Sequence, residues 1–587
     1  MFNKHGLLRG LFTCAVTAAL LFPCGVHSQE QPQDDELMES IVTTGFRVSQ
    51  GGAQDINFFR GEVAFARIPH PDTLTAEGLM SEHDIVFAGT DSCRQLFCLT
   101  GEASRADLIA VPGARYLAGV GFATNLDENK WRRARLNLIA VVDKSGSMDG
   151  EPLELVRQSL TTLANQLRPG DQMTIVLYGD RAHVHLRTTA ATRFGVPTIL
   201  ESITNIRSEG STSMEAGLTL GYDIAESTAP AFKGVTRLML FTDERPNTDA
   251  TDAESFMGMA ESASRGGIGL TTIGVGVQFG AELATQISSV RGGNLYFIRD
   301  AADIRTLFTG QLNYMVSELA YDLKLTITPH AGLKIGGVYG IPGELLGWQN
   351  ETSVTVTIPT VFLDNHGGGI FFTLMPEPGS EFLPETPSVG QLADVSVTYL
   401  PIAPGARTES HAVSIAMRSA GPSEGMALGH LLIDEFTVLH GATTAHYLHN
   451  DQEAAYRLIS DFRTRLEDSP LDGLDGEKEL IASLHDRIAF LSGHGVESNA
   501  PLARLWGRWK IVQARGETDF SAGETVEFTA DNNFVTDDGS EEYECSAKQI
   551  YLTDSEKVFK YDIRGNKLSL RHLRSNERVQ LERQPAG

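Results

Sequence analysis

Three side chains in one short stretch could bind a metal ion. Asp143, Ser145 and Ser147 place a carboxylate and two hydroxyls within five residues. They follow the apolar run 136–142 and precede a helical pattern, so we expect them at the mouth of a buried strand. Oxygen atoms of this kind are hard ligands that suit Mg²⁺, Mn²⁺ or Ca²⁺ rather than zinc. The stretch is therefore a candidate cation site.

Two later loops carry further oxygen ligands. Thr212 lies in the loop 210–213, which opens a helical pattern, and Asp243 follows the apolar run 238–241. In an open α/β sheet, ligands bind beyond the carboxyl ends of the strands, near the point where the strand order reverses. We therefore expect Asp143, Thr212 and Asp243 to meet and, with water, to supply an octahedral oxygen site.

The elements that must position these loops lie in residues 134–310. Apolar strands alternate there with amphipathic helices, which indicates βαβ units and a mostly parallel sheet with helices on both faces. We expect strands at 136–143, 173–180, 183–188, 236–242, 269–276 and 294–299. We expect helices near 152–167, 213–226, 252–264, 281–290 and 301–316.

The flanks of this α/β domain have different patterns. Residues 56–130 contain short β-prone runs, including 85–87 and 116–122, and residues 320–415 alternate with period two. We expect these two flanks to form one β-sandwich that the α/β domain interrupts. The chain of 587 residues is too long for one core, so a multidomain α/β plus β architecture follows.

The C-terminal third contains two further segments. Residues 425–493 have helical periodicity, and residues 502–585 are β-rich. The latter segment contains Gly507 and Trp509, resembles the start of a lipocalin, and is short for eight strands. We therefore predict a small barrel-like domain or a curved sheet, packed by tryptophan and phenylalanine side chains.

The three loops resemble the metal-ion-dependent adhesion site of a von Willebrand factor type A domain, over residues 136–310. The resemblance implies that Ser145, Ser147 and Thr212 contact the cation directly, and that Asp143 and Asp243 act directly or through water. It also implies one open coordination position for an acidic group of a protein partner. Mg²⁺ is the expected cation, with Ca²⁺ or Mn²⁺ as alternatives.

Two positions depart from the pattern of that family. Glu244 stands where a glycine usually follows the third-loop aspartate, and Ser211 stands where glycine is common. The carboxylate of Glu244 is expected either to fill the open position or to shift the metal preference toward Ca²⁺. The alternative is that the loops are present and the metal is vestigial.

The net charge of −27 narrows the class of partner. The chain has 75 acidic residues against 48 basic ones, and such a surface repels nucleic acid and anionic lipid. No run beyond the N-terminus is long and apolar enough for a membrane-spanning helix. We therefore expect a protein partner, no nucleic acid and no integral membrane span.

The N-terminus has the pattern of an export signal over residues 1–28, followed by a polar, flexible leader over 29–55. The expected location is therefore the bacterial periplasm or the cell surface. Cys24 leaves open a lipid anchor, although the residues before it fit a lipobox poorly. Residues 39–45 resemble the segment that opens the plug of TonB-dependent receptors, or are a chance β-prone run.

Cysteine spacing fits the same compartment. Cys93 and Cys98 are close enough for a small-loop disulfide, which an oxidising compartment allows; two buried thiols are the alternative. Cys545 is left unpaired in the first interpretation.

Competing chemistry finds less support in the sequence. The phosphotransfer loop of haloacid-dehalogenase-type hydrolases needs a second acid two residues after the first, and that position is Ser145. Residues 468–479 resemble an EF-hand loop, but Pro470 removes one ligand, and an acidic interhelical linker is the alternative. Four histidines between 430 and 449 are expected to be surface or packed helical residues.

We therefore expect an exported, metal-dependent binding protein rather than an enzyme. Two alternatives stay open. The first is an envelope assembly or chaperone-like factor acting with an outer-membrane complex. The second is a metal-dependent hydrolase.

Overall fold

The computed structural model describes residues 47–584, apart from 51, 54, 65–66, 88–92, 128–129, 212, 244–249, 276–289, 342–345, 349–352, 365–366, 380–389, 403–404, 495–503, 517, 530–531, 538, 546–548, 556 and 573–574. Several expectations fall outside the described residues: the export signal over 1–28, the lipid anchor at Cys24, the segment 39–45, Thr212, Glu244 and most of the helix at 281–290. Among the described residues, no helix has both the length and the apolar character needed to cross a membrane.

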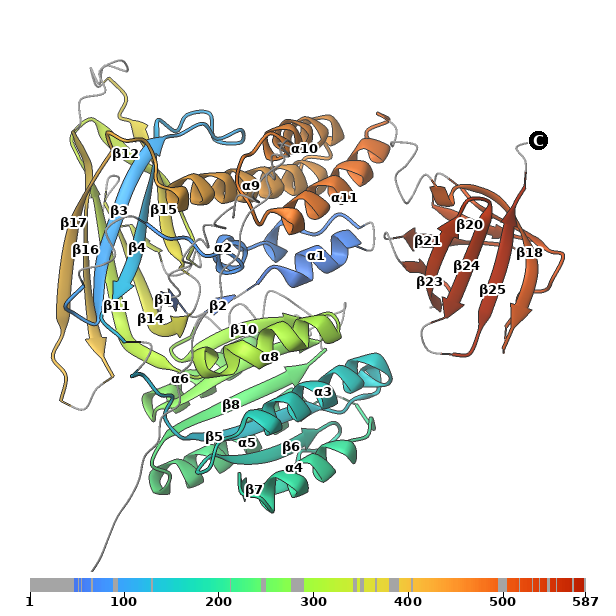
Figure 1. Ribbon diagram of the computed structural model, residues 1–587, viewed down its shortest axis with the longest axis horizontal. Helices are drawn as coiled ribbons and strands as arrows, with labels where there is room; N and C mark the ends of the chain where they lie inside the picture. The colour runs from blue at the N-terminus through green and yellow to red at the C-terminus, as the bar shows by residue number, and fades with distance from the viewer. Residues whose placement is uncertain are drawn as a thin grey trace, which may run out of the picture. The chain divides into compact units, whose positions relative to one another are not determined.

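A seven-stranded sheet lies at the centre of the α/β domain, in the order β2-β10-β9-β8-β5-β6-β7 (Figure 1). Neighbouring strands are parallel except for the edge pair β6 and β7. The strands are β2 (Gly52–Ala53), β5 (Leu136–Asp143), β6 (Gln172–Tyr178), β7 (His183–Ala190), β8 (Val235–Thr242), β9 (Ile268–Val275) and β10 (Gly293–Ile298). The predicted α/β architecture is confirmed.

Helices cover both faces of this sheet, and β5 is therefore buried on both sides. Leu138 and Ala140 pack in one apolar cluster with α3 and α8, whereas Ile139 and Val141 pack in another with α5 and α6. Such period-two alternation sends successive side chains to opposite faces. The helices are α3 (Glu151–Gln166), α4 (Gly195–Thr204), α5 (Met214–Thr228), α6 (Ala250–Arg265) and α8 (Ala301–Met315). Helix α4 was not expected.

A β-sandwich is formed by strands from both sides of the α/β domain in the chain. Strand β15 pairs with β4, and the two sheets share one buried apolar cluster. One sheet contains β1 (Arg47–Gln50), β11 (Glu318–Pro329), β13 (Leu346–Trp348), β14 (Val354–Asp364), β16 (Gln391–Pro401) and β17 (Glu409–Ala416). The other contains β3 (Phe97–Arg105), β4 (Tyr116–Thr124), β12 (Leu333–Tyr339) and β15 (Gly369–Pro376).

The first part of the N-terminal flank was wrongly expected to be β-rich. It forms α1 (Asn57–Ala64), η1 (Pro71–Thr73) and α2 (Ala76–Ser81). Ile56, Phe59 and Val63 recur at the spacing of a helix and are all buried in one cluster. The end of the expected flexible leader is also ordered, because β1 pairs with β14 and β2 pairs with β10.

The run 85–87 is not a strand, although Ile85 and Phe87 are buried. The backbone N–H of Ile85 donates to the carbonyl of Gly367 at 2.7 Å, outside any named strand. The ring of Phe87 occupies space left by Gly119 and Gly121 of β4, where an added Cβ would lie 2.4–2.7 Å from the ring. Burial alone therefore explains the apolar run.

Three helices follow the sandwich: α9 (Glu424–Tyr447), α10 (Gln452–Glu467) and α11 (Asp475–Leu491). They share an apolar cluster with α1, α2 and two residues of the four-stranded sheet, Leu117 and Phe371. Because α11 already begins at Asp475, the last part of the EF-hand-like stretch is helical, and residues 468–474 are an interhelical linker.

The C-terminal segment is a closed barrel of eight strands, so the expectation that it was too short for eight was wrong. Short strands make this size sufficient, and side chains including Trp509, Phe528 and Tyr543 are buried in its interior. The strands are β18 (Gly507–Arg515), β19 (Thr525–Phe528), β20 (Asn533–Thr536), β21 (Gly539–Cys545), β22 (Gln549–Leu552), β23 (Lys557–Arg564), β24 (Lys567–His572) and β25 (Arg578–Arg583).

The cysteines fall into two classes. A disulfide joins Cys93, which lies before β3, to Cys98, which is the second residue of β3. Cys545 is a buried thiol at the end of β21, with its Sγ 3.5 Å from the hydroxyl of Tyr561, and burial raises the pKa of this thiol to about 12. A thiol with such a pKa is almost wholly protonated at neutral pH and therefore reacts slowly.

Candidate functional site

Two aspartates lie at the carboxyl ends of adjacent parallel strands. Asp143 is the last residue of β5, and Asp243 follows directly after β8. The chain leaves β5 for β6 on one side, whereas β8 lies on the other side of β5. The strand order therefore reverses here, which is where open α/β sheets bind ligands.

The carboxylate of Asp143 is fixed by its own loop and by β8. Its Oδ1 accepts the backbone N–H of Ser145 at 2.8 Å, and its Oδ2 accepts the hydroxyl of Thr242 at 3.2 Å. Asp143 is fully buried. These two hydrogen bonds fix the position of the Asp143 carboxylate within the fold.

Ser147 connects the first loop to Asp243. Its Oγ donates to Asp243 Oδ1 at 3.0 Å and lies 3.0 Å from Ser145 Oγ. Ser145 and Asp243 are buried, whereas Ser147 is exposed. The group of oxygen atoms therefore reaches from the interior at Asp143 to solvent at Ser147, and a ligand could approach from the side of Ser147.

The electrostatics of the two acids fit a cation. Burial and repulsion from Asp143 raise the pKa of Asp243 to about 6. The hydrogen bond from Ser147 opposes this rise, because it favours the ionised form of Asp243. Burial also raises the pKa of Asp143. Two partly desolvated carboxylates side by side repel each other, and a divalent cation between them would remove this cost. The donor set of carboxylates and hydroxyls therefore fits Mg²⁺, Mn²⁺ or Ca²⁺.

Backbone hydrogen bonds hold the second loop against the first. Gly146 donates to the carbonyl of Gly210 at 3.0 Å, and Glu209 donates to the carbonyl of Lys144 at 2.6 Å. Gly210 has a φ of +90°, which favours glycine at this turn. The loop that carries Thr212 is therefore attached to the loop that carries Ser145 and Ser147.

Asp180 and Glu209 also support the site, and the sequence patterns did not single them out. Asp180 Oδ1 accepts both the backbone N–H and the hydroxyl of Ser211, at 2.8 and 2.5 Å. Lys144 of the first loop pairs with Glu209 at 3.1 Å. The signal for Asp180 was its place two residues after β6, the strand next to β5.

Comparisons with known proteins identify the type of this α/β domain. The family model of the von Willebrand factor type A domain matches residues 137–310. The Escherichia coli (strain K12) protein YfbK is 30% identical over 194 residues, which are 32% of this chain and 33% of YfbK. Inter-alpha-trypsin inhibitor heavy chain H1 of Mesocricetus auratus is 25% identical over 194 residues, 32% of this chain and 21% of that protein.

The chain thus spans a third or less of the length of these two relatives. Among solved structures, the von Willebrand factor type A protein of Catenulispora acidiphila is similar, with 14% identity and a TM-score of 0.43, over 68% of this chain and 98% of that one. The family match covers the whole seven-stranded sheet except β2 and the first residue of β5. Residues 137–310 of this chain are a von Willebrand factor type A domain.

Proposed function

We propose that this protein is an exported, divalent-metal-dependent binding protein, which captures an acidic group of a protein partner at the Asp143 site. Domains of this type mostly mediate protein–protein interactions. The single observation that carries the proposal is the convergence of Asp143, Ser145, Ser147 and Asp243 at one point of the sheet. A binding role therefore fits better than an enzymatic one.

Each residue of the site has a distinct role in the proposal. Asp143 and Asp243 supply negative charge, directly or through water, and Ser145 and Ser147 supply neutral oxygen ligands. Thr212, carried by the loop that Gly210 and Ser211 anchor, is proposed as a third neutral ligand. When bound, the cation supplies a Lewis-acidic position for an external anion.

Access from solvent supports a partner rather than a purely structural ion. Ser147 is exposed, although its hydroxyl contacts the buried Asp243. A carboxylate on another protein can approach on this side without moving the sheet. Glu244 is proposed as the modulator of this open position, because it directly follows Asp243 in the chain.

Export is the second part of the proposal. The disulfide between Cys93 and Cys98 is typical of an oxidising compartment such as the bacterial periplasm. The signal-like residues 1–28 and the acidic composition agree with a secreted or envelope protein. An envelope assembly factor would use the same site with a different partner.

The test is a pull-down from envelope extract with the full chain, in the presence of Mg²⁺ or of a chelator. Wild type is compared with Asp143→Ala and with Asp149→Ala, since Asp149 is an exposed acid in the same loop. We expect a partner that is retained by wild type and Asp149→Ala in Mg²⁺ and is lost with chelator or with Asp143→Ala. A partner retained equally under all conditions would contradict the proposal.

A further inference from the structure

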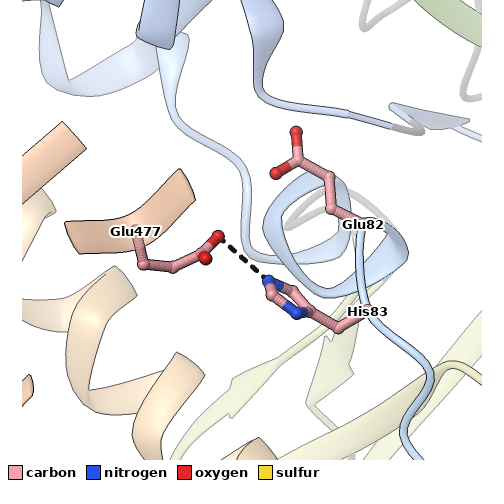
Figure 2. A group of neighbouring side chains, drawn as sticks. All are labelled: Glu82, His83 and Glu477. Atoms are coloured by element: carbon pink, nitrogen blue, oxygen red, sulfur yellow. Dashed lines mark hydrogen bonds and ion pairs between the residues drawn. The ribbon is translucent and has the colours of Figure 1, made fainter. Parts of the chain in front are cut away.

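A second group of ionisable side chains lies outside the von Willebrand factor type A domain. Glu82 and His83 follow α2 directly, and Glu477 lies in the first turn of α11. One possible ligand atom of each lies within 4.8 Å of the others. Figure 2 shows the His83 ring pointing at Glu477, with Nε2 and Oε1 3.0 Å apart.

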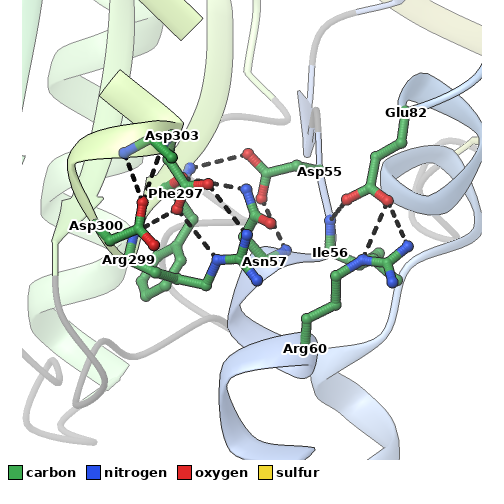
Figure 3. A network of polar contacts seen from close by, with 10 residues as sticks. Asp55, Ile56, Asn57, Arg60, Glu82, Phe297, Arg299, Asp300 and Asp303 are labelled. Carbon is green, nitrogen blue, oxygen red and sulfur yellow. Dashed lines mark hydrogen bonds and ion pairs between the residues drawn. The ribbon is translucent and has the colours of Figure 1, made fainter. Parts of the chain in front are cut away.

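Arg60 of α1 occupies one side of this group. Its Nη2 donates to Glu82 Oε2 and to Glu477 Oε1, each at 2.7 Å, and its Nη1 donates to the carbonyl of Gly476 at 2.9 Å. Figure 3 shows that Nε and Nη2 of Arg60 both donate to Oε2 of Glu82. The Oε1 of Glu82 accepts the backbone N–H of Ile56. Arg60 thus fixes two carboxylates and neutralises one of them.

Glu435 of α9 is the observation that points to a ligand. It is fully buried, and neither of its carboxyl oxygens has a hydrogen-bond partner among the described residues. The charges acting on it most strongly are those of Glu477, Arg60 and Glu82, so it lies near the same group. Burial raises its pKa well above the usual range for glutamate. A buried carboxyl without partners is costly and calls for an ion or another compensating group.

Charge balance indicates which ion would fit. Ionised Glu82 and Glu477 carry two negative charges against the one positive charge of Arg60, and a cation bound beside Glu435 would favour its ionised form as well. With all three carboxylates ionised, two negative charges are left uncompensated. A divalent cation would neutralise this excess. An imidazole among the ligands favours Zn²⁺ or a similar transition metal over Mg²⁺ and Ca²⁺, which prefer oxygen ligands alone.

We propose that Glu82, His83 and Glu477 bind a transition-metal dication, with Zn²⁺ as the best fit, and that the buried carboxylate of Glu435 nearby supplies further negative charge. The metal would join the segment after α2 to α11, close to Glu435 of α9. The Asp143 site uses oxygen ligands alone and binds a different class of cation. This inference therefore does not depend on the function proposed for that site.

Zinc binding to the full chain tests the proposal. The Asp143→Asn variant serves as the background, so that the first site does not contribute, and Glu435→Gln or Glu479→Gln is added to it. Glu479 is an exposed acid on the same helix as Glu477 and serves as the matched control. Zinc content after dialysis against buffered Zn²⁺ is measured by plasma mass spectrometry, and folding is checked by circular dichroism.

We expect about one zinc per chain in the background variant and in Glu479→Gln, and at least about tenfold weaker binding in Glu435→Gln. Zinc should also raise the melting temperature of the background variant but not that of Glu435→Gln. His83→Gln should behave like Glu435→Gln and provides a second route if one variant folds poorly. Equal zinc content with and without Glu435, or no zinc in the folded background variant, would overturn the proposal.

Discussion

The hydroxyl of Ser147 donates to the carboxylate of Asp243 at 3.0 Å, although 96 positions separate the two residues in the chain. Ser147 belongs to the loop after β5, and Asp243 belongs to the loop after β8. The contact links the exposed part of the candidate site to its buried part. It exists because β5 and β8 are adjacent and parallel, so that their carboxyl ends lie at the same edge of the sheet.

Ser147→Ala should weaken metal binding without weakening the fold. The change removes a proposed ligand and the hydrogen bond to Asp243, and we expect Mn²⁺ affinity to fall at least about tenfold. Because Ser147 is exposed, the stability should change by no more than about 0.5 kcal/mol. Mn²⁺ titration followed by electron paramagnetic resonance measures the affinity. Ser227→Ala, an exposed serine on α5, is the control, and an equal affinity in both variants would count against a role for Ser147.

Asp55 should make the stability depend on pH. Its carboxylate accepts the backbone N–H groups of Asn57 and Phe297, each at 3.0 Å (Figure 3), and burial raises its pKa from 3.8 to about 7. The folded chain therefore holds a proton on Asp55 at pH values where the unfolded chain has lost it. Stability must fall as the pH rises through this window, and it is not regained above about pH 7.

Asp55→Asn isolates this contribution, since asparagine does not ionise. Asparagine also lacks one of the two acceptor oxygens, so the variant should be less stable than wild type at about pH 5. We expect the advantage of wild type to shrink as the pH rises from about 5 to 8. Urea unfolding of both proteins across this range provides the measurement. A stability difference that stays constant with pH would show that Asp55 does not titrate there.

Arg60→Met should strongly destabilise the metal-free chain. The change leaves Glu82 and Glu477 without their shared cation, and removing one partner of a buried ion pair costs about 3–5 kcal/mol. Arg508→Met is the control, because the exposed Arg508 pairs with Glu527 on the surface of the barrel and such pairs contribute at most about 1 kcal/mol. Urea unfolding in the presence of a chelator compares the two. Similar losses in both variants would contradict a central role for Arg60.

Two glycines of α9 should respond in opposite ways to alanine. At Gly425 an added Cβ would lie 2.1 Å from the carbonyl oxygen of Val86, which is backbone and cannot easily move. At Gly441 the nearest atom is the flexible side chain of Leu458, at 3.3 Å. Alanine favours a helix by about 1 kcal/mol over glycine. Thermal unfolding should therefore show a loss for Gly425→Ala and little change or a gain for Gly441→Ala; a gain at both would be inconsistent with the close approach of α9 to Val86.

The α/β domain and its candidate site could be predicted because their signals are local. An apolar run that ends in Asp143, followed by Ser145 and Ser147, indicates a strand end with oxygen ligands wherever it occurs. The order of the strands then follows from general rules for parallel sheets. The helices between residues 57 and 81 were not predicted, because their apolar runs are short. Residues such as Phe59 and Val63 fit the spacing of a strand almost as well as that of a helix.

Contacts between distant segments could not be predicted in this way. Arg237 lies in the middle of the apolar strand β8 and is fully buried. It is satisfied by the Oε1 of Glu318 at 2.9 Å and by Asn294 at 2.8 Å, from β11 and β10. Glu477 is a similar case, since its partners Arg60 and His83 lie some 400 positions earlier. Only the folded chain shows which charges are paired.

The most direct test of the Asp143 site is calorimetric titration of the full chain with Mg²⁺. Wild type is compared with Asp143→Asn, which keeps the shape of a buried side chain but removes its charge, and with Asp149→Asn, the exposed acid of the same loop. We expect one binding event of similar affinity in wild type and Asp149→Asn, and none in Asp143→Asn. Equal Mg²⁺ binding by wild type and Asp143→Asn, or none by wild type, would contradict the metal site on which the proposed function rests.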